Sequence, residues 1–297
     1  MSEPTRHDDV VHRFVIDAAA TRGALVRLSE SWTAVKQAAQ YPETVAAMLG
    51  EALAASALLG SHTKIDGRLS LQARGRGALR ILLAEYRAPG LLRGLAHWQD
   101  PLPEALTPAS FGQDALLAIT LESQQPGEEE PTRYQGLVDL HASSLSLALE
   151  RYFERSEQLP TRLLLRVRGD QAAGLLLQAL PGMDADPDGF NRAGHFMDTV
   201  SDAELFGLPA ETLLHRLFHE DGVRLLTEQS LRFSCTCSRE RVAQMIEGIG
   251  EDEAFASLQD DVMEVICEFC NRRYRFDRID LTQLFGHNLN ASPQRSQ

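Results

Sequence analysis

Residues 233–242 read FSCTCSRERV and residues 262–276 read VMEVICEFCNRRYRF, and these two stretches hold every cysteine of the chain. The cysteines form two close pairs, which are Cys235 with Cys237 and Cys267 with Cys270. Random placement would confine four cysteines to the C-terminal quarter in only about one chain in 400. Two such pairs suit a tetrahedral zinc site, because each pair supplies two thiolates from one short turn. The spacing therefore predicts one zinc ion per chain, bound by all four cysteines.

The residues around the first pair favour ionised sulfur. Ser238 follows Cys237 and can cap a helix with the sequence SRERVAQMIEGIG, which places Cys237 at the positive end of that helix. Arg239 and Arg241 add positive charge nearby, and both effects favour a thiolate. The first pair is CxC, whereas inert structural ribbons more often use CxxC twice. An inert structural zinc stays open as the alternative.

The second pair interrupts β-prone sequence, so we expect Cys267 and Cys270 at the turn of a hairpin. Arg272, Arg273 and Arg275 follow the pair. They form either a solvated strand face or a partial compensation for the negative charge of a site with four thiolates.

Composition limits the class of protein. The chain has 297 residues, 43% of them hydrophobic, and a net charge of -13, which indicates two domains and disfavours nucleic acid and anionic membranes as partners. The first 14 residues lack the apolar stretch of a secretory signal, and the apolar window 45–60 is too short to span a bilayer and contains Glu51. We expect a cytoplasmic protein, whose reducing surroundings favour zinc thiolates over permanent disulfides.

Residues 1–180 have the pattern of an α+β core with helices packed on a mixed or antiparallel sheet. Alternating apolar residues predict strands in LSLQAR and TRLLLRVRG, and LLAITLE and RYQGLVDL predict a hairpin whose long connection is QQPGEEEP. Helical spacing predicts one helix from about Val45 to Gly60 and a second in SSLSLALERYFERS.

Residues 181–230 predict a helical linker between this core and a small zinc-binding domain at residues 231–297. HFMDTVSDAELFG and PAETLLHRLFHE have helical patterns, and the segment shows no long strand pattern. Its apolar side chains are too many for a solvated linker, so they must pack on another part of the protein. They are Phe190, Phe196, Met197, Leu205, Phe206, Leu213, Leu214, Leu217 and Phe218.

No catalytic constellation is recognisable in the sequence, so we expect a protein that is not an enzyme. His215 and His219 have the spacing of a helical zinc pair, but Arg216 stands where a metalloprotease needs its catalytic glutamate. DADPDG at residues 184–189 imitates the start of a calcium loop, but His195 occupies the position of the bidentate glutamate.

The cysteine pattern, together with further stretches, resembles the heat-shock protein 33 family of redox-regulated 33 kDa chaperonins. These stretches are YFERSEQLPT, the FG of ALTPASFGQDALLAITL, YQGLVDL, and LLHRLFHEDGVRLL running into FSCTCSRERV. The likeness covers nearly the whole chain, and the cysteine spacing with CSRERV is its most specific part.

The resemblance implies a substrate-binding core, a metastable linker and a zinc switch in which Cys235, Cys237, Cys267 and Cys270 are ligands and redox sensors. Family members are inactive while reduced and bound to zinc. Peroxide with unfolding stress, or hypochlorous acid, turns them into ATP-independent holdases for unfolding proteins. They bind clients as dimers, with the reduced form expected to be a monomer, and pass them to the Hsp70 system.

Four cysteines allow three disulfide pairings. Two of them would tether the CxC turn to the CxxC turn and keep the zinc domain compact. A switch of the kind that the resemblance implies needs the domain to unfold. We therefore expect the local pairs Cys235–Cys237 and Cys267–Cys270, with sulfenic acid as the first product.

Two other classes of function stay open at this point. A nucleic-acid-binding zinc module would use the arginines after Cys270, although residues 231–297 carry more acidic than basic side chains. A thiol-disulfide oxidoreductase would place its CxxC at the start of a helix, where this sequence predicts a hairpin.

Overall fold

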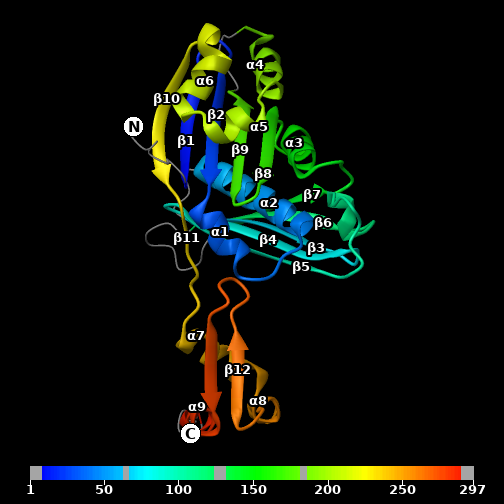
Figure 1. Ribbon diagram of the computed structural model, residues 1–297, viewed down its shortest axis with the longest axis vertical. Coiled ribbons are helices and arrows are strands. Elements are labelled where there is room, and N and C mark those ends of the chain that lie inside the picture. The colour runs from blue at the N-terminus through cyan, green and yellow to red at the C-terminus, as the bar shows by residue number, and fades with distance from the viewer. Residues whose placement is uncertain (1–8, 63–66, 124–131, 181–185, 289–297) are drawn as a thin grey trace, which may run out of the picture. The chain divides into compact units, whose positions relative to one another are not determined.

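The computed structural model describes residues 9–62, 67–123, 132–180 and 186–288. The chain divides between Ser234 and Cys235 into two compact units, each with its own core (Figure 1). The predicted α+β class is confirmed. The sequence pattern predicts one sheet in the core, whereas the first unit contains two.

The first sheet has five antiparallel strands in the order β10-β1-β2-β9-β8. They are β1 (Val10–Ile16), β2 (Thr21–Leu28), β8 (Thr161–Arg168), β9 (Gln171–Ala179) and β10 (Val223–Ser230). Both faces of its central strands are buried, since alternate residues of β2 and β9 enter two different apolar clusters. The strand predicted in TRLLLRVRG is β8.

The second sheet has the order β11-β5-β4-β3-β6-β7 and is antiparallel except for the parallel pair β11 and β5. Its strands are β3 (Gly67–Arg74), β4 (Leu79–Arg87), β5 (Leu91–Trp98), β6 (Leu116–Ser123), β7 (Thr132–Asp139) and β11 (Arg232–Phe233). The predicted strand in LSLQAR is β3, and the predicted hairpin is β6 and β7. The expected connection QQPGEEEP lies outside the described residues.

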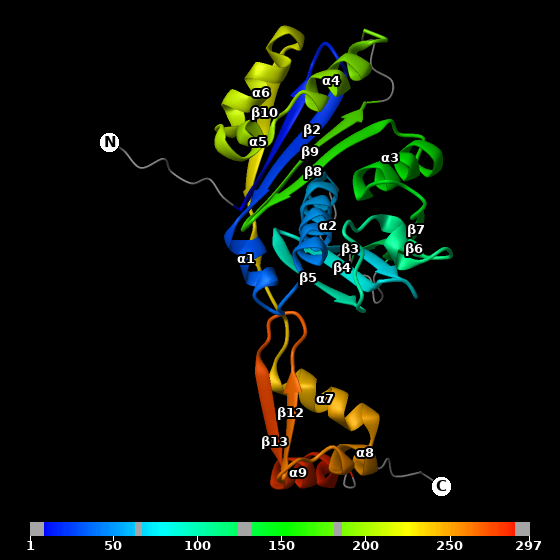
Figure 2. The same ribbon diagram turned by 45° about the vertical axis from the view of Figure 1, so that its right-hand side comes forward.

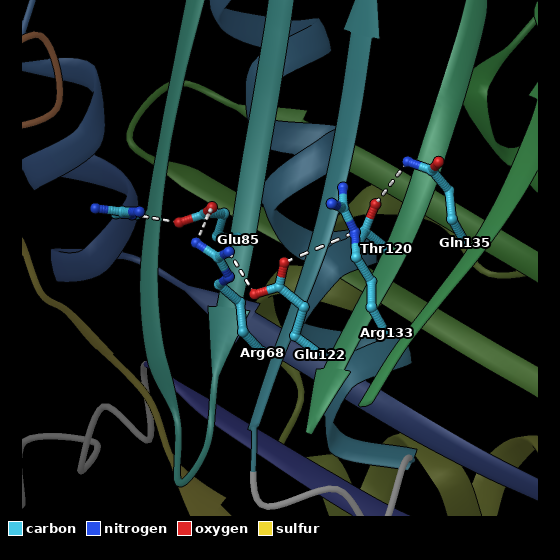
Figure 3. Close-up of polar contacts among 7 residues, drawn as sticks. Arg68, Glu85, Thr120, Glu122, Arg133 and Gln135 are labelled. Atoms are coloured by element: carbon cyan, nitrogen blue, oxygen red, sulfur yellow. Dashed lines mark hydrogen bonds and ion pairs between the residues drawn. The ribbon is translucent and has the colours of Figure 1, made fainter. Parts of the chain in front are cut away.

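Charged side chains cross the outer face of this sheet from strand to strand. Glu85 is buried between Arg68 and Arg93, and Arg68 also reaches Glu122 at 2.5 Å. Glu122 then faces Arg133 on β7 across 3.9 Å (Figure 3). Opposite charges on neighbouring strands stabilise the pairing, so this ladder supports the register of the sheet on a face that carries few core side chains.

The long helix α2 (Glu43–His62) lies between the two sheets (Figures 1 and 2). Val45, Leu49, Leu53 and Leu58 are fully buried in the cluster that joins the sheets. The helix extends beyond the predicted bounds, and by length and composition it could span a membrane, contrary to the expectation. Most of the apolar part of α2 is buried inside the protein, and this burial explains why the helix is so hydrophobic.

Glu51 lies in the middle of α2. Burial of its carboxyl group raises the pKa from 4.5 to about 7, and the charge of Arg166 opposes this shift. The folded protein therefore binds this proton more tightly than the unfolded chain, and the stability falls as the pH rises from 4.5 to 7. We expect Glu51→Gln to raise the free energy of unfolding at pH 8 by about 1 to 3 kcal/mol. Denaturant titrations at pH 4.5 and pH 8 check this.

Glu154→Gln is the control for the Glu51 variant, because the side chain of Glu154 lies at the surface. A Glu51→Gln protein whose stability gain is the same at pH 4.5 as at pH 8 would contradict the assignment.

Two other helices complete the core of the first unit. The helix α1 (Glu30–Lys36) begins where the buried Asp9 carboxylate accepts hydrogen bonds from the backbone N–H groups of Glu30 and Ser31, at 2.8 and 2.9 Å. The helix α3 (Leu145–Ser156) is the second predicted helix, and its N-cap Ser144 accepts a hydrogen bond from the backbone of Leu147. Short 3₁₀ turns at Pro108–Phe111 and His219–Asp221 lie in the connections.

The segment predicted as a linker packs on the face of the first sheet that α2 leaves free. Its helices are α4 (Gly189–Asp198), α5 (Asp202–Gly207) and α6 (Ala210–Phe218). Figure 2 shows these helices over that face of the sheet. Their apolar side chains form a cluster with Phe14, Ile16, Leu25 and Leu175. The expectation that these side chains pack on another part of the protein is confirmed. The calcium-like stretch at 184–189 lies partly outside the described residues.

The expectation that this segment has no long strand is wrong. Residues 223–230 form β10, which pairs with β1 from Val223 opposite Ile16 to Ser230 opposite Val10. The strand lies at the edge of the sheet and is largely exposed on both faces, so it lacks the apolar alternation that identifies a half-buried strand. β11 follows directly, and its pairing with β5 carries the hydrogen-bonded backbone up to Ser234.

The second unit is a small α+β domain that starts at Cys235. It contains α7 (Arg239–Ile249), α8 (Glu251–Ala256), β12 (Val262–Ile266), β13 (Arg273–Asp277) and α9 (Arg278–Asn288). Its core is small, with Ile246, Ala254, Phe276 and Leu281 at the centre. A core of this size supplies little free energy of folding, so such domains usually depend on a metal or disulfides.

Candidate metal centre

The structure brings all four predicted cysteines together in the second unit. The sulfur atoms of the four cysteines all lie within 4.8 Å of one another. In the described part of the chain, no other set of three or more His, Cys, Asp or Glu side chains is grouped in this way. His215 of α6 and His219, in the turn that follows it, stack their rings on each other and are not part of such a group. The four cysteines could therefore hold a metal ion.

Cys267 and Cys270 lie in the turn between β12 and β13, as predicted. The backbone N–H of Cys267 donates to the carbonyl of Arg272 at 2.9 Å, and the N–H of Asn271 donates to the carbonyl of Cys267 at 2.8 Å. Asn271 has a φ of 57°, a left-handed conformation that asparagine tolerates well. These bonds fold the turn so that both sulfur atoms point to the same side. A redox-active CxxC pair at the start of a helix is a different arrangement.

Cys235 and Cys237 precede α7, and the predicted cap of that helix is confirmed. The Ser238 hydroxyl accepts a hydrogen bond from the backbone N–H of Arg241 at 3.3 Å. The Arg241 guanidinium donates to the carbonyl of Thr236 at 2.8 Å, which fixes the segment between the two cysteines. The helix N-terminus therefore directs its positive end toward this pair.

The distances between sulfur atoms fit a tetrahedral metal site. Cys235 Sγ lies 3.6 Å from Cys267 Sγ, and Cys237 Sγ lies 3.4 Å from Cys270 Sγ. A zinc–sulfur bond of about 2.3 Å places two thiolates of a tetrahedron about 3.8 Å apart. The sulfurs are too far apart for a disulfide bond of about 2.05 Å, and the four cysteines are thiols. The donor set, four sulfurs without carboxylate or imidazole, is one that zinc prefers.

Tyr274 contacts this site, although the sequence pattern does not single it out. Its hydroxyl donates a hydrogen bond to Cys237 Sγ at 3.1 Å. Burial opposes ionisation of Cys237, but this bond and the neighbouring Cys270 lower its pKa to about 7. Burial raises the pKa of Cys235. Cys237 therefore carries the thiolate more readily than Cys235.

The arginines after Cys270 divide between two roles. Arg273 and Arg275 both pair with Glu264 at 2.9 Å, as expected for a solvated strand face, so they do not offer a free basic patch for nucleic acid. A side-chain hydrogen bond with Tyr274, and then the charge of Cys237 and Cys270, raise the pKa of Arg272. Of the three arginines, Arg272 is therefore the one that fits the alternative of charge compensation. The guanidinium group of Arg239 forms an ion pair with Asp280 and lies over the ring of Phe276.

Two of the four thiols pack against the small core of the second unit. Cys237 and Cys267 pack against the cluster that contains Val242, Met263 and Tyr274. The centre therefore joins α7 to the hairpin, two segments of the unit that are far apart in the sequence. A change in the sulfur ligands would act directly on the folding of this unit.

Comparison with known proteins places the chain in one family. The model of the Hsp33 protein family matches residues 9–277. A 33 kDa chaperonin of Chromobacterium violaceum is 38% identical over 98% of both chains, and one of Nitrosococcus oceani is 41% identical over 95% of this chain and 96% of its own. The crystal structure of a 33 kDa chaperonin from Thermotoga maritima matches with a TM-score of 0.80 over 96% of this chain and all of its own, at 20% identity. The chain therefore belongs to the Hsp33 family, whose named relatives support a chaperone function.

Proposed function

We propose that this protein is a redox-regulated, ATP-independent holdase that binds unfolding proteins under oxidative stress. The observation that carries the proposal is the convergence of four thiols, without other ligand types, in a unit against whose small core two of them pack. A sensor needs groups that an oxidant attacks and a structure that depends on them, and this site offers both.

In the reduced protein, Cys235, Cys237, Cys267 and Cys270 would hold one zinc ion, which keeps the thiolates in place and joins α7 to the hairpin. A thiolate attacks hydrogen peroxide, and the O–O bond breaks to give sulfenic acid and hydroxide. The second thiolate of the pair attacks the sulfenic sulfur and displaces water once the hydroxyl is protonated. Each disulfide uses one peroxide and two electrons, so two peroxides oxidise the four thiols and leave no ligands for the ion.

The fold suggests how the signal reaches a client-binding surface. We assign residues 1–180 to the client-binding core, 181–230 to a conditionally stable linker and 231–297 to the zinc switch. The linker helices cover an apolar face of the first sheet, and β10 and β11 lead from them directly to Cys235. Release of these helices would expose the covered face to clients.

The Phe218→Ala variant tests the role of the linker. Phe218 is fully buried and stacks on Phe14 of β1 with the ring centroids 5.9 Å apart. Loss of the ring should destabilise the packing of α6 by about 3 to 5 kcal/mol. We expect this variant to suppress client aggregation at lower oxidant concentration or with milder heating than the unsubstituted protein.

Light scattering of a heated client, together with a hydrophobic dye on the chaperone alone, measures both effects of the variant. Leu226→Ala is the matched control, because Leu226 is on β10 with 52% of its surface exposed. A Phe218→Ala protein with the threshold and dye fluorescence of the unsubstituted protein would count against a covering role for the linker.

The remaining parts of the proposal follow the family resemblance. We infer that the protein is cytoplasmic, is not an enzyme, is a monomer when reduced and a homodimer when oxidised, and passes its clients to the Hsp70 system. Suppression of aggregation by the oxidised form, without nucleotide, tests the holdase function. Retention on heparin or reduction of insulin would instead favour a nucleic-acid-binding or an oxidoreductase function.

A further inference from the structure

The strand β8 carries a row of arginines on the face of the first sheet that the linker helices cover. This arginine row, which consists of Arg162, Arg166 and Arg168, alternates with apolar residues that pack in the cluster between the two sheets. Leu164 lies in the same row and packs against the cluster of the linker helices. The row therefore borders the apolar centre of the covered face on the side of β8.

Two arginines of the row form ion pairs with the linker helices. The guanidinium group of Arg162 donates to both carboxylate oxygens of Asp198, the last residue of α4, at 2.7 and 2.9 Å. Arg166 Nε lies 3.5 Å from a carboxylate oxygen of Asp202, the first residue of α5. The two ion pairs thus hold the end of one linker helix and the start of the next.

Two further contacts hold α5 on the same face. The guanidinium group of Arg168 lies over the ring of Phe206, 4.5 Å from its centroid. From β2, Arg27 Nε donates a hydrogen bond to the carbonyl of Leu205 at 2.7 Å. Arginine side chains of the sheet therefore contact carboxylates, an aromatic ring and a carbonyl group of the linker.

The linker and the sheet carry opposite charges. Residues 186–222 contain eight acidic residues and two arginines. The five strands of the sheet contain seven arginines and one acidic residue, Glu228, which lies 3.6 Å from His12. Complementary charges select the partner of a surface and fix its register. The linker therefore fits the covered face by its charge as well as by its apolar side chains.

Carboxyl groups of the core compensate the arginine row only in part. Glu150 of α3 lies 3.7 Å from Arg162. Glu51 of α2 interacts with Arg166, but its pKa of about 7 leaves this carboxyl group only about half ionised at neutral pH. The arginines outnumber these carboxylates, so the row keeps a positive charge when the linker helices move away.

We propose that this face of the first sheet, once the linker is released, binds amphipathic helices of unfolding clients that carry acidic residues beside their apolar side chains. The inference rests on the proposed holdase function and specifies the class of client segment that this surface takes. In the reduced protein the linker helices occupy the surface as such a client would, so linker and client compete for it. The apolar centre supplies affinity, and the arginine row selects acidic segments.

A fluorescently labelled peptide of residues 189–218, added to the oxidised full-length protein, tests this surface. The matched probe is the same peptide with its four acidic residues replaced by Asn or Gln, which keeps the length and the apolar side chains. We expect the acidic peptide to bind at least about tenfold more tightly in an anisotropy titration, and this difference to disappear at high salt. Equal affinity for the two peptides at low salt would overturn the proposal.

The double variant Arg162→Gln with Arg166→Gln separates charge selection from apolar packing. In the oxidised protein it should weaken binding of the acidic peptide about tenfold and leave binding of the neutral peptide unchanged. In the reduced protein it should lower the oxidant concentration needed for activation, because the linker loses two ion pairs. Lysine at both positions should restore part of the selectivity. Arg133→Gln is the matched control, since its side chain is 62% exposed on the second sheet, and it should change neither property.

The outcomes separate this surface from the holdase function. An oxidised protein that suppresses client aggregation but binds neither peptide, or binds the acidic peptide equally well after both arginines are replaced, would overturn this surface and leave the holdase function intact. An oxidised protein that suppresses no aggregation would contradict the holdase function itself.

Discussion

Cys267→Ser is expected to abolish tight zinc binding by the reduced protein. Cys267 supplies one of the four sulfurs and is held in the hairpin turn by a backbone hydrogen bond to Arg272. Three thiolates with an open position make a different kind of zinc site, one that is not closed to water. Because binding of structural zinc is worth about 10 to 16 kcal/mol in small domains, its loss should also unfold the second unit.

Competition with a chromogenic chelator and the circular dichroism of the reduced variant measure the two effects. Tyr274→Phe is a graded control: it keeps the ring in the core but removes the hydroxyl that donates to Cys237 Sγ. Loss of such an outer partner costs about 10 to 100-fold in metal affinity, so this variant should still bind zinc. A reduced protein that contains no metal when purified without chelator would refute the assignment of a zinc site.

Oxidation is expected to produce the local disulfides Cys235–Cys237 and Cys267–Cys270. The loop-entropy relation gives only about 1.5 to 2 kcal/mol for each of these short loops, before any strain is subtracted. Such disulfides cannot replace zinc binding worth about 10 to 16 kcal/mol. The second unit should therefore unfold when the pairs close locally, and this is the outcome that a switch requires.

The geometry of the reduced site brings together sulfur atoms of different pairs, which is opposite to the pairing that we expect after oxidation. The sulfur contacts at 3.4 and 3.6 Å join Cys237 to Cys270 and Cys235 to Cys267, so proximity in the folded state would favour the crossed pairs. Crossed disulfides would keep α7 attached to the hairpin after the ion has left. Proteolysis of the oxidised protein followed by mass spectrometry distinguishes them. A dominant peptide that links residue 235 or 237 to residue 267 or 270 would overturn the proposed switch.

The sequence was sufficient wherever a local signal decides the structure. The cap at Ser238, the hairpin turn between Cys267 and Cys270, and the strand β8 each depend on a few neighbouring residues. The convergence of the thiols could be predicted as well, because two close cysteine pairs at this spacing are typical of a zinc site with four thiolates.

Other features could not be read from the sequence because they depend on tertiary contacts. β10 has no apolar alternation, and only its pairing with β1 makes it a strand. The position of α2 between two sheets follows from packing of all its faces, which one helical pattern does not reveal. The role of Tyr274 depends on the fold of β13 against α7, although its alternation with Phe276 on the inner face was a usable signal.

The central claim is that one zinc centre controls chaperone activity, and a single oxidant titration tests it most directly. Zinc content, free thiols and suppression of client aggregation are measured on the same sample as peroxide is added under mild unfolding stress, and then again after reduction with zinc present. We expect one zinc per reduced chain, loss of zinc and of four thiols in proportion to the gain of activity, and reversal on reduction. Full activity in the reduced, zinc-bound protein, or complete loss of zinc without any gain of activity, would contradict the account.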